Sequence, residues 1–436
     1  MSRPGQAPRS AAPGPGRSVL IYGMNYLPEL AGIGPYTGQI AEFLAEQGHQ
    51  VLVVTTPPHY PGWRVTGDHA NRWSREVNNG VEVLRCPLVL PKRVGGLSRL
   101  VPSLTFALSS APVVLARILG RRPQVVMVVE PTLMGAPFAI LAARMTGARL
   151  VLHVQDLEVD AAIAVGHLGK GPVGALARAF DRWVKRRFDR VVTISNRMAE
   201  LIAAKGVAAD RIRVVRNWVD TDRIRPLAGP SPYRAELALP DEAFVCLYSG
   251  NLGAKQGLDL LVEAAERLAD RPDIRFIVAG EGPMRPMLEA AAARLPSLSV
   301  LPFQPLERLS DFLGLADLHL LPQQRDAADL LLPSKLGGML ASGRRLLVTA
   351  DPGTELHSFL GDSAIVTAPG DADAMAGAIR AAVGAPDPRR DARLALAAGL
   401  SRTTLIRRFE MALLETVEPA LAAAPVPPAA KAKVAA

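Results

Sequence analysis

Short, almost wholly apolar runs recur along both halves of this chain and alternate with segments of helical periodicity. Continuous apolar runs of this kind are typical of strands buried on both faces of a parallel sheet, whose crossover connections are helices. The pattern therefore predicts an α/β chain with two Rossmann-like domains. The strands expected in the first half are residues 19–22, 51–54, 81–84, 125–129, 150–154, 191–194 and 212–215. Those expected in the second half are residues 244–248, 275–279, 299–301, 318–321, 346–349 and 364–366.

Length and proline content set the expected domain boundaries. At 436 residues the chain is longer than a single hydrophobic core usually supports. Four prolines between residues 226 and 240 indicate a linker. Both ends are rich in Pro, Gly and Ala and are expected to be disordered. The predicted division is a disordered 1–16, a first domain 17–225, a second domain 226–402, a closing helix 403–418 that could cross back to the first domain, and a disordered tail 419–436.

Cysteine and histidine are too scattered to indicate a metal or disulfide framework. Cys86 and Cys246 lie in unrelated strand-like runs, and the seven histidines show no ligand spacing such as His-x-x-x-His. We therefore expect no obligatory metal and no cofactor. A reducing cytoplasm fits this use of cysteine.

The charge of the chain is concentrated in its first half. Residues 1–225 carry 29 Lys and Arg against 16 Asp and Glu, whereas the remainder carries 21 against 25. A basic domain favours an anionic partner, either nucleic acid or a membrane surface, although a preference for arginine in the genome would give the same count. The sequence contains no recognisable nucleic-acid motif, so we expect a membrane surface as partner and no nucleic acid.

Residues 97–119 combine apolar and basic side chains. Because Ser103, Ser109, Ser110 and Pro112 interrupt this stretch, we expect it to be too broken to span a membrane, which takes roughly 20 predominantly apolar residues. Two interpretations stay open: a helix lying in the membrane interface, and an ordinary core helix with exposed arginines. The basic residues that flank or interrupt it are Lys92, Arg93, Arg99, Arg117, Arg121 and Arg122.

Two glycine-rich turns indicate a phosphate site. Residues 249–257, Ser-Gly-Asn-Leu-Gly-Ala-Lys-Gln-Gly, link a buried strand to a helix, and Lys255 adds a positive charge there. A second turn contains Gly32 and Gly34 and follows its strand too late to be a dinucleotide fingerprint. A purely structural turn is the alternative. Together the two turns predict a diphosphate held between the domains.

A third segment with phosphate-binding character is Pro333-Ser334-Lys335, which precedes a helical run at residues 336–341. Ser334 is expected to be the N-cap of that helix. Lys335 would lie in the first turn, where a cation is unfavourable unless an anion is bound nearby. The alternative is a solvated surface lysine.

Several segments in this order resemble the family 4 glycosyltransferases of the GT-B fold, in which two Rossmann-like domains with parallel sheets face across a cleft. They are Tyr-Gly-Met-Asn-Tyr-Leu-Pro-Glu at 22–29 with the glycine turn, Leu-His-Val-Gln-Asp-Leu-Glu-Val-Asp at 152–160, the stretch 249–257, and Leu-Pro-Ser-Lys-Leu at 332–336. The resemblance covers residues 18–409, and within the family it is to enzymes of colanic-acid-like exopolysaccharide biosynthesis.

The resemblance implies transfer of a sugar from a nucleotide-diphosphate donor, with retention of configuration and without an obligatory metal. On the acceptor side it implies Asp156 and Asp160, with Glu158 nearby and His153 a packed strand residue. The donor-binding residues that it implies are Gly32, Gly34, Asn251, Lys255, Gln256, Glu281, Phe303, Gln304, Ser334, Lys335 and Leu336.

The chain departs from the family pattern in three places. Many relatives carry Arg at the position of Asn251 and His at that of Gln155. A pair of glutamates is replaced by Leu330 and Gly338, so ribose recognition is unassigned, and Asp326 or Asp329 could substitute.

The resulting hypothesis is a retaining glycosyltransferase at the inner face of the cytoplasmic membrane. It would move a sugar, from GDP-fucose in preference to a UDP-sugar, to a lipid-diphosphate-linked oligosaccharide. The missing glutamates motivate an alternative, a non-catalytic sugar-nucleotide-binding or scaffold subunit of a polysaccharide assembly complex.

Overall fold

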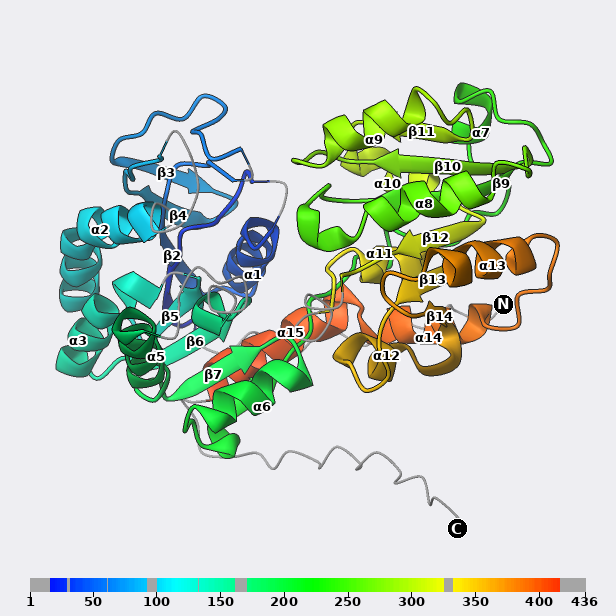
Figure 1. The fold of residues 1–436 in the computed structure, drawn as a ribbon. Helices are drawn as coiled ribbons and strands as arrows, with labels where there is room; N and C mark the ends of the chain where they lie inside the picture. Colours follow the sequence, from blue (N-terminus) through cyan, green and yellow to red (C-terminus); the bar gives the residue numbers. More distant parts are fainter. Residues whose placement is uncertain are drawn as a thin grey trace, which may run out of the picture.

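The computed structural model describes residues 16–29, 32–60, 62–91, 100–131, 133–160, 171–324 and 332–415. They form two α/β domains, each a parallel sheet with helices on both faces (Figure 1). The predicted fold class is confirmed.

The first domain contains an eight-stranded sheet in the order β3-β4-β2-β1-β5-β6-β7-β8. All neighbouring strands are parallel except β3, which pairs antiparallel with β4 at one edge. The edge strand was missed because its sequence, Ser-Arg-Glu-Val-Asn, is mostly polar and exposed. The bounds are β1 (Ser18–Tyr22), β2 (Gln50–Thr55), β3 (Ser74–Asn78), β4 (Val81–Arg85), β5 (Val125–Glu130), β6 (Arg149–Val154), β7 (Arg190–Thr193) and β8 (Ile212–Val214).

The second domain contains a six-stranded, wholly parallel sheet in the order β11-β10-β9-β12-β13-β14. Its central strands are almost completely buried, as their continuous apolar runs predict. The bounds are β9 (Phe244–Ser249), β10 (Ile274–Ala279), β11 (Leu298–Leu301), β12 (Leu318–Leu321), β13 (Arg345–Thr349) and β14 (Ile365–Thr367).

Helices connect the strands and cover the sheets (Figure 1). In the first domain they are α1 (Gly34–Glu46), α2 (Leu100–Arg121), α3 (Ala136–Thr146), α5 (Pro172–Lys185) and α6 (Asn196–Ala204). From the linker onward they are α7 (Tyr233–Glu236), α8 (Asp259–Arg267), α9 (Arg285–Ala292), α10 (Leu309–Leu313), α11 (Leu336–Ala341), α12 (Glu355–Leu360), α13 (Ala372–Ala382), α14 (Arg390–Gly399) and α15 (Arg402–Leu414).

Helix α2 corrects the expectation of a broken segment, since it runs without interruption through Pro112. Its serines find partners: the Ser109 hydroxyl donates to the Pro87 carbonyl at 2.6 Å, and Ser110 lies 2.6 Å from the Tyr22 hydroxyl. Within the described residues α2 is the one helix long and apolar enough to span a membrane, and 39% of its most apolar window is buried. Lys92, Arg93 and Arg99 lie outside the described residues.

The last helix, α15, returns to the first domain and packs beside β5, β7 and α1 (Figure 1). Its buried Phe409 ring lies 4.7 Å from the His153 ring and 6.4 Å from that of Trp218, between centroids. Where the chain enters α15, the Val219 amide donates to the Leu400 carbonyl at 2.9 Å, and the Arg402 amide donates to the Val219 carbonyl at 2.8 Å. These contacts join the C-terminal part of the chain to the first domain.

A second interdomain contact involves Glu355 at the start of α12. Its carboxylate accepts hydrogen bonds from the backbone amides of Asn196 and Arg197, at 3.3 and 3.4 Å, and pairs with the Arg216 guanidinium at 3.0 Å. An acidic group is favourable at the N-terminus of α6, because the free amide groups there carry partial positive charge. One carboxylate of the second domain therefore caps a helix of the first.

We expect Phe409→Ala to lower the free energy of unfolding by about 3–5 kcal/mol, because it removes a buried ring and leaves a cavity. Met411→Ala on the same helix truncates a side chain that is 61% exposed. It should change the free energy by less than about 0.5 kcal/mol. Urea titrations followed by circular dichroism measure both, and equal effects would contradict the packing of α15 described here.

Candidate functional site

The glycine-rich turns after β9 and β10 lie against each other at the carboxyl edge of the second sheet. A Cβ atom on Gly280 would lie 1.8 Å from the Gly250 carbonyl oxygen, and one on Gly282 would lie 2.5 Å from that of Leu252. Their φ values are +152° and +153°, so glycine is required at both positions for close backbone approach and for conformation. Ligands of open α/β sheets bind at this edge.

Lys335 extends beneath the first of these turns. Its ammonium donates to the Tyr248 hydroxyl at 2.6 Å and to Oε1 of Gln256 at 2.9 Å, and it lies 3.9 Å from the centre of the Tyr248 ring. Among the described residues no carboxylate pairs with it, and none contributes to its pKa. Burial lowers the pKa of Lys335 from 10.5 to about 7. A desolvated cation without a counterion is prepared for an anionic ligand.

Lys255 brings the second domain close to the carboxylates of the first. The residue is exposed, as is Asn251 in the same turn. Burial raises the pKa of Asp156, which follows β6, and the charge of Lys255 opposes that rise. A lysine of one domain therefore lies within electrostatic range of a carboxylate of the other. The sequence predicted both residues for the site, but only the tertiary structure puts them together.

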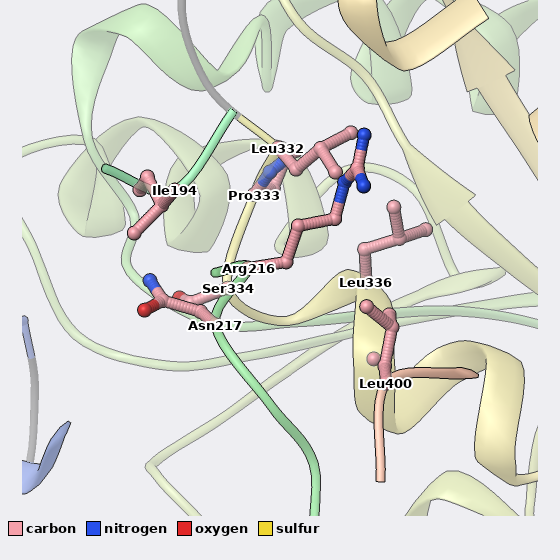
Figure 2. A pocket seen from close by; sticks show the side chains of 9 residues that line it. Ile194, Arg216, Asn217, Leu332, Pro333, Ser334, Leu336 and Leu400 are labelled. Atoms are coloured by element: carbon pink, nitrogen blue, oxygen red, sulfur yellow. The ribbon is translucent and has the colours of Figure 1, made fainter. Parts of the chain in front are cut away.

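A hollow of about 310 Å³, part of it open to solvent, lies between the domains (Figure 2). Gln155 and Asn217 form a reciprocal amide pair at its wall, each amide nitrogen 3.0 Å from the other's oxygen. Its lining residues are Ile194, Arg216, Asn217, Leu332, Pro333, Ser334, Leu336, Gly337 and Leu400. Of the predicted donor-binding residues, the hollow thus includes Ser334 and Leu336.

The expected cap of α11 is wrong. The helix begins at Leu336 with Lys335 as its N-cap residue, and no side chain caps it. Ser334 is instead exposed at the rim of the hollow, and Leu336 is almost completely buried. The prediction failed because the chain turns one residue later, which lets Lys335 reach Tyr248.

In the first domain, protein atoms lie close to Gly32, which is exposed, and to Gly34, which is buried. A Cβ atom on Gly32, at φ +71°, would lie 2.9 Å from the Tyr60 ring, and one on Gly34 would lie 3.0 Å from Cβ and Oε2 of Glu29. These close contacts explain a glycine at each position, and binding of a phosphate by this turn stays a prediction.

The acidic residues after β6 have different surroundings. Asp160 pairs with Lys205, which also lies 2.5 Å from Asp181. Burial raises the pKa of Glu158 to about 8, with nearby carboxylates adding to the effect, so Glu158 is mostly protonated at neutral pH. Asp156 is the carboxylate of this group whose pKa the charge of Lys255 lowers. His153 is buried against Phe409, and burial lowers its pKa to about 3.

A buried ion pair lies next to this segment, because Lys205, the partner of Asp160, also pairs with Asp181 of that ion pair. The Lys185 ammonium lies 2.8 Å from Glu130 and also contacts Asp181, and all three side chains are almost completely buried. Burial alone would lower the pKa of Lys185, but the carboxylates of Glu130 and Asp181 outweigh it and raise that pKa. The sequence did not predict this cluster, because Lys185 and Glu130 are 55 residues apart.

The expected nucleoside contacts lie at the ends of β10 and β11. Glu281 pairs with Arg285 at 3.0 Å, Phe303 is 46% exposed, and Gln304 accepts a hydrogen bond from the Tyr233 hydroxyl at 2.9 Å. A Cβ atom on Gly338 would meet the side chain of Leu313 at 3.0 Å. Asp326, Asp329 and Leu330 lie outside the described residues.

Comparison with known proteins identifies the family. The model of the glycosyl transferase 4-like domain matches residues 31–218, and that of the glycosyl transferases group 1 matches residues 243–384. WcaI of Escherichia coli K12, a glycosyl transferase assigned to colanic acid biosynthesis, is 40% identical over 90% of this chain and 98% of its own length. This chain belongs to the family 4 glycosyltransferases.

Other similar proteins agree with this family and its fold. A GDP-mannose-dependent alpha-mannosyltransferase of Mycobacterium tuberculosis is 27% identical over 63% of this chain and 66% of its own. Sucrose-phosphate synthase of Thermosynechococcus elongatus superposes with a TM-score of 0.70, at 14% identity, over 92% of this chain and 99% of its own. Anabaena HepE in complex with UDP and glucose superposes with a TM-score of 0.65, at 15% identity, over 92% and 100%. This glycosyltransferase therefore has the GT-B fold.

We expect the affinity of this glycosyltransferase for GDP or UDP to fall as the pH rises above about 7. Below that pH the Lys335 ammonium is already charged, whereas above it binding must take up a proton, so affinity drops by at most about tenfold per pH unit. Calorimetric titrations at several pH values, in buffers of different ionisation enthalpy, measure the affinity and the proton uptake. In Lys335→Arg, which stays charged, the dependence should flatten. A flat profile in the unaltered protein would contradict the prediction.

Proposed function

We propose that this enzyme transfers a sugar, with retention of configuration, from a nucleotide-diphosphate donor to a lipid-diphosphate-linked oligosaccharide in exopolysaccharide biosynthesis of the colanic-acid type. The observation that carries this proposal is the electrostatic interaction between Lys255 of the second domain and Asp156 of the first, together with the partly buried ammonium of Lys335, which donates to Gln256 next to Lys255 in the chain. The pathway follows from the similarity to WcaI.

The donor diphosphate would lie at the turns after β9 and β10, next to Lys255 and Lys335. In the reaction the bond between the sugar C1 and the phosphate oxygen breaks, and the nucleoside diphosphate leaves with the electron pair. The acceptor hydroxyl oxygen forms the new bond to C1, and its proton passes to the leaving diphosphate. The lysines stabilise the charge that develops on the leaving group, without a bound metal, and Asp156 orients the attacking hydroxyl.

GDP-fucose is our favoured donor and UDP-sugars are second. A GDP-mannose-dependent relative supports a guanosine nucleotide, whereas the complex of HepE with UDP supports uridine. Purified protein incubated with a panel of GDP- and UDP-sugars tests the proposal through release of the nucleotide. If no donor is bound or turned over, the proposed function is wrong.

The alternative function, a non-catalytic sugar-nucleotide-binding or scaffold subunit, rests on the absence of a glutamate at Gly338, where an apolar side chain fills the neighbouring space. Polymer production in cells discriminates between the two. A scaffold would support production with Lys255→Ala, whereas an enzyme would not.

We expect Lys255→Ala to lower kcat by about 100- to 1,000-fold, because it removes a charge that stabilises the leaving diphosphate. Arg294→Ala is the matched control in the same domain, since its side chain is 57% exposed and pairs with Glu266 on the surface. The control should keep nearly full activity. Nucleotide release with the best donor of the panel measures both, and equal activities would contradict the role of Lys255.

The enzyme would work at the inner face of the cytoplasmic membrane, docked through its first domain. Leu104 and Leu108 lie one turn apart on α2 and are 49% and 60% exposed, and Val89, 56% exposed, donates its amide to Thr105 of the same helix at 2.9 Å. Arg117 lies two to three turns further along. Exposed apolar side chains suit a membrane surface, and the basic charge of the first half of the chain suits an anionic one.

We expect the double variant Leu104→Glu, Leu108→Glu to bind vesicles of phosphatidylglycerol and phosphatidylcholine at least about tenfold more weakly, since a fully buried leucine contributes about 1.5–3 kcal/mol. Leu306→Glu, which alters a leucine that is 47% exposed on the second domain, is the control. Vesicle sedimentation measures binding. Unchanged sedimentation of the double variant would exclude this docking surface.

A further inference from the structure

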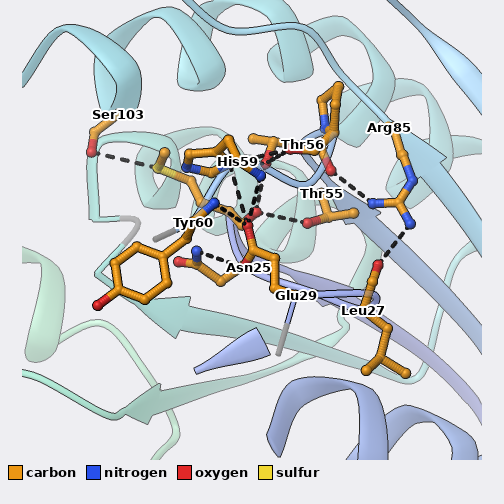
Figure 3. Close-up of polar contacts among 11 residues, drawn as sticks. Asn25, Leu27, Glu29, Thr55, Thr56, His59, Tyr60, Arg85 and Ser103 are labelled. Carbon is orange, nitrogen blue, oxygen red and sulfur yellow. Dashed lines mark hydrogen bonds and ion pairs between the residues drawn. The ribbon is translucent and has the colours of Figure 1, made fainter. Parts of the chain in front are cut away.

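A buried carboxylate joins two loops at the carboxyl edge of the first sheet (Figure 3). Oε1 of Glu29, from the loop after β1, accepts hydrogen bonds from the backbone amides of His59 and Tyr60, both at 3.0 Å. Its other oxygen, Oε2, accepts a hydrogen bond from the side-chain amide of Asn25 at 2.9 Å. Glu29 and His59 are 3% and 2% exposed. The loop after β2 is therefore held in one position as it leaves the sheet.

Arg85 holds the same two loops from the other side (Figure 3). Its guanidinium donates to the Leu27 carbonyl at 2.7 Å and to the Thr56 carbonyl at 2.9 Å, and it pairs with Glu76 at 2.6 Å. Arg85 is only 2% exposed. Two buried charged side chains, Glu29 and Arg85, thus hold the loop that carries Tyr60 in one position.

Tyr60 is the first partly exposed residue after this buried cluster, and its ring points away from it (Figure 3). The ring lies beside Gly32, where any larger residue would collide with it. Burial raises the pKa of the Tyr60 hydroxyl, and the charges of Glu29 and Asp156 add to the effect. The Tyr60 hydroxyl therefore lies within electrostatic range of Asp156.

Trp63 extends this aromatic surface. Its ring is partly exposed and lies edge-on to those of Tyr60 and His59, at centroid distances of 6.5 and 6.0 Å. Its backbone has a φ of +52°, a conformation that bulky residues rarely adopt and that clusters at functional sites. Trp63 lies in a turn, and its side chain is not one of the buried core residues.

We propose that Tyr60 and Trp63 form a sugar-binding surface that receives a pyranose ring of the acceptor, a binding site that rests on the proposed function. An aromatic face covers the C–H groups of a sugar ring, and a carboxylate within reach accepts hydrogen bonds from the sugar hydroxyls. Asp156, whose charge acts on the Tyr60 hydroxyl, is the carboxylate that we propose for this role. Glu29 and Arg85 are positioning residues, which act through the loop and touch no sugar.

The experiment is a saturation-transfer NMR titration of the full-length protein with methyl β-D-galactopyranoside, methyl α-D-glucopyranoside and cellobiose. At least one of these sugars should bind, with the strongest saturation on the C–H protons of one ring face. Trp63→Asn should weaken binding at least about tenfold, or about 1.4 kcal/mol. Asparagine tolerates a positive φ, so this variant removes the ring without straining the loop. Tyr60→Ala should weaken binding as well, and Trp63→Phe should restore part of it.

Two controls make the result specific. Trp73→Ala alters a more exposed tryptophan of the same domain, 60% exposed, and should leave sugar binding unchanged. The affinity of Trp63→Asn for GDP or UDP should equal that of the unaltered protein, which also shows that the variant folds. The proposal is overturned if none of the three sugars binds, or if Trp63→Asn binds them as well as the unaltered protein does. Failure of the proposed function would appear separately, as absent turnover of every donor.

Discussion

The structure depends on the enclosure of one positive charge, the ammonium of Lys335, against the Tyr248 ring and the Gln256 amide. Removing an ammonium from water is unfavourable unless an opposite charge compensates. The described residues offer a hydroxyl, an amide oxygen and an aromatic face, which stabilise the cation only in part. The site is therefore electrostatically incomplete without an anion, and the diphosphate of the proposed donor would supply one. Gly250, Gly280 and Gly282 let the two turns next to Lys335 approach each other closely, because none of them has a side chain that would clash.

In the first domain, by contrast, charged side chains have partners within the protein. Lys185 and Lys205 are each paired with carboxylates, and Glu29 accepts three hydrogen bonds from its surroundings. Groups that are satisfied in this way cannot bind a ligand anion strongly, but they hold loops in place. The second domain thus provides charge for the donor, while the first provides a rigid frame on which Asp156 and the Tyr60 ring are presented. Contacts of Glu355 and α15 hold the two domains together.

Several parts of the site followed from local sequence. The turn containing Lys255 was predicted because a buried strand, closely spaced glycines and a helix follow one another within a short segment. The partners of Lys335 were not predicted, since Tyr248 is 87 residues away and reads as an ordinary strand residue. The cap assigned to Ser334 was wrong because the helix begins at Leu336, so that Lys335 and not Ser334 is its N-cap residue. The edge strand β3 lacked the apolar run that marked the others.

The sequence by itself determined the two-domain α/β architecture, because strands buried on both faces must be apolar throughout and such runs are visible without any alignment. It also predicted the glycine-rich turn after β9. Only the tertiary structure decided which charges remain uncompensated, which glycines are required by close contacts, and which carboxylate the charge of Lys255 reaches. Those properties depend on burial and on pairs of residues far apart in the chain, and local sequence carries no record of either.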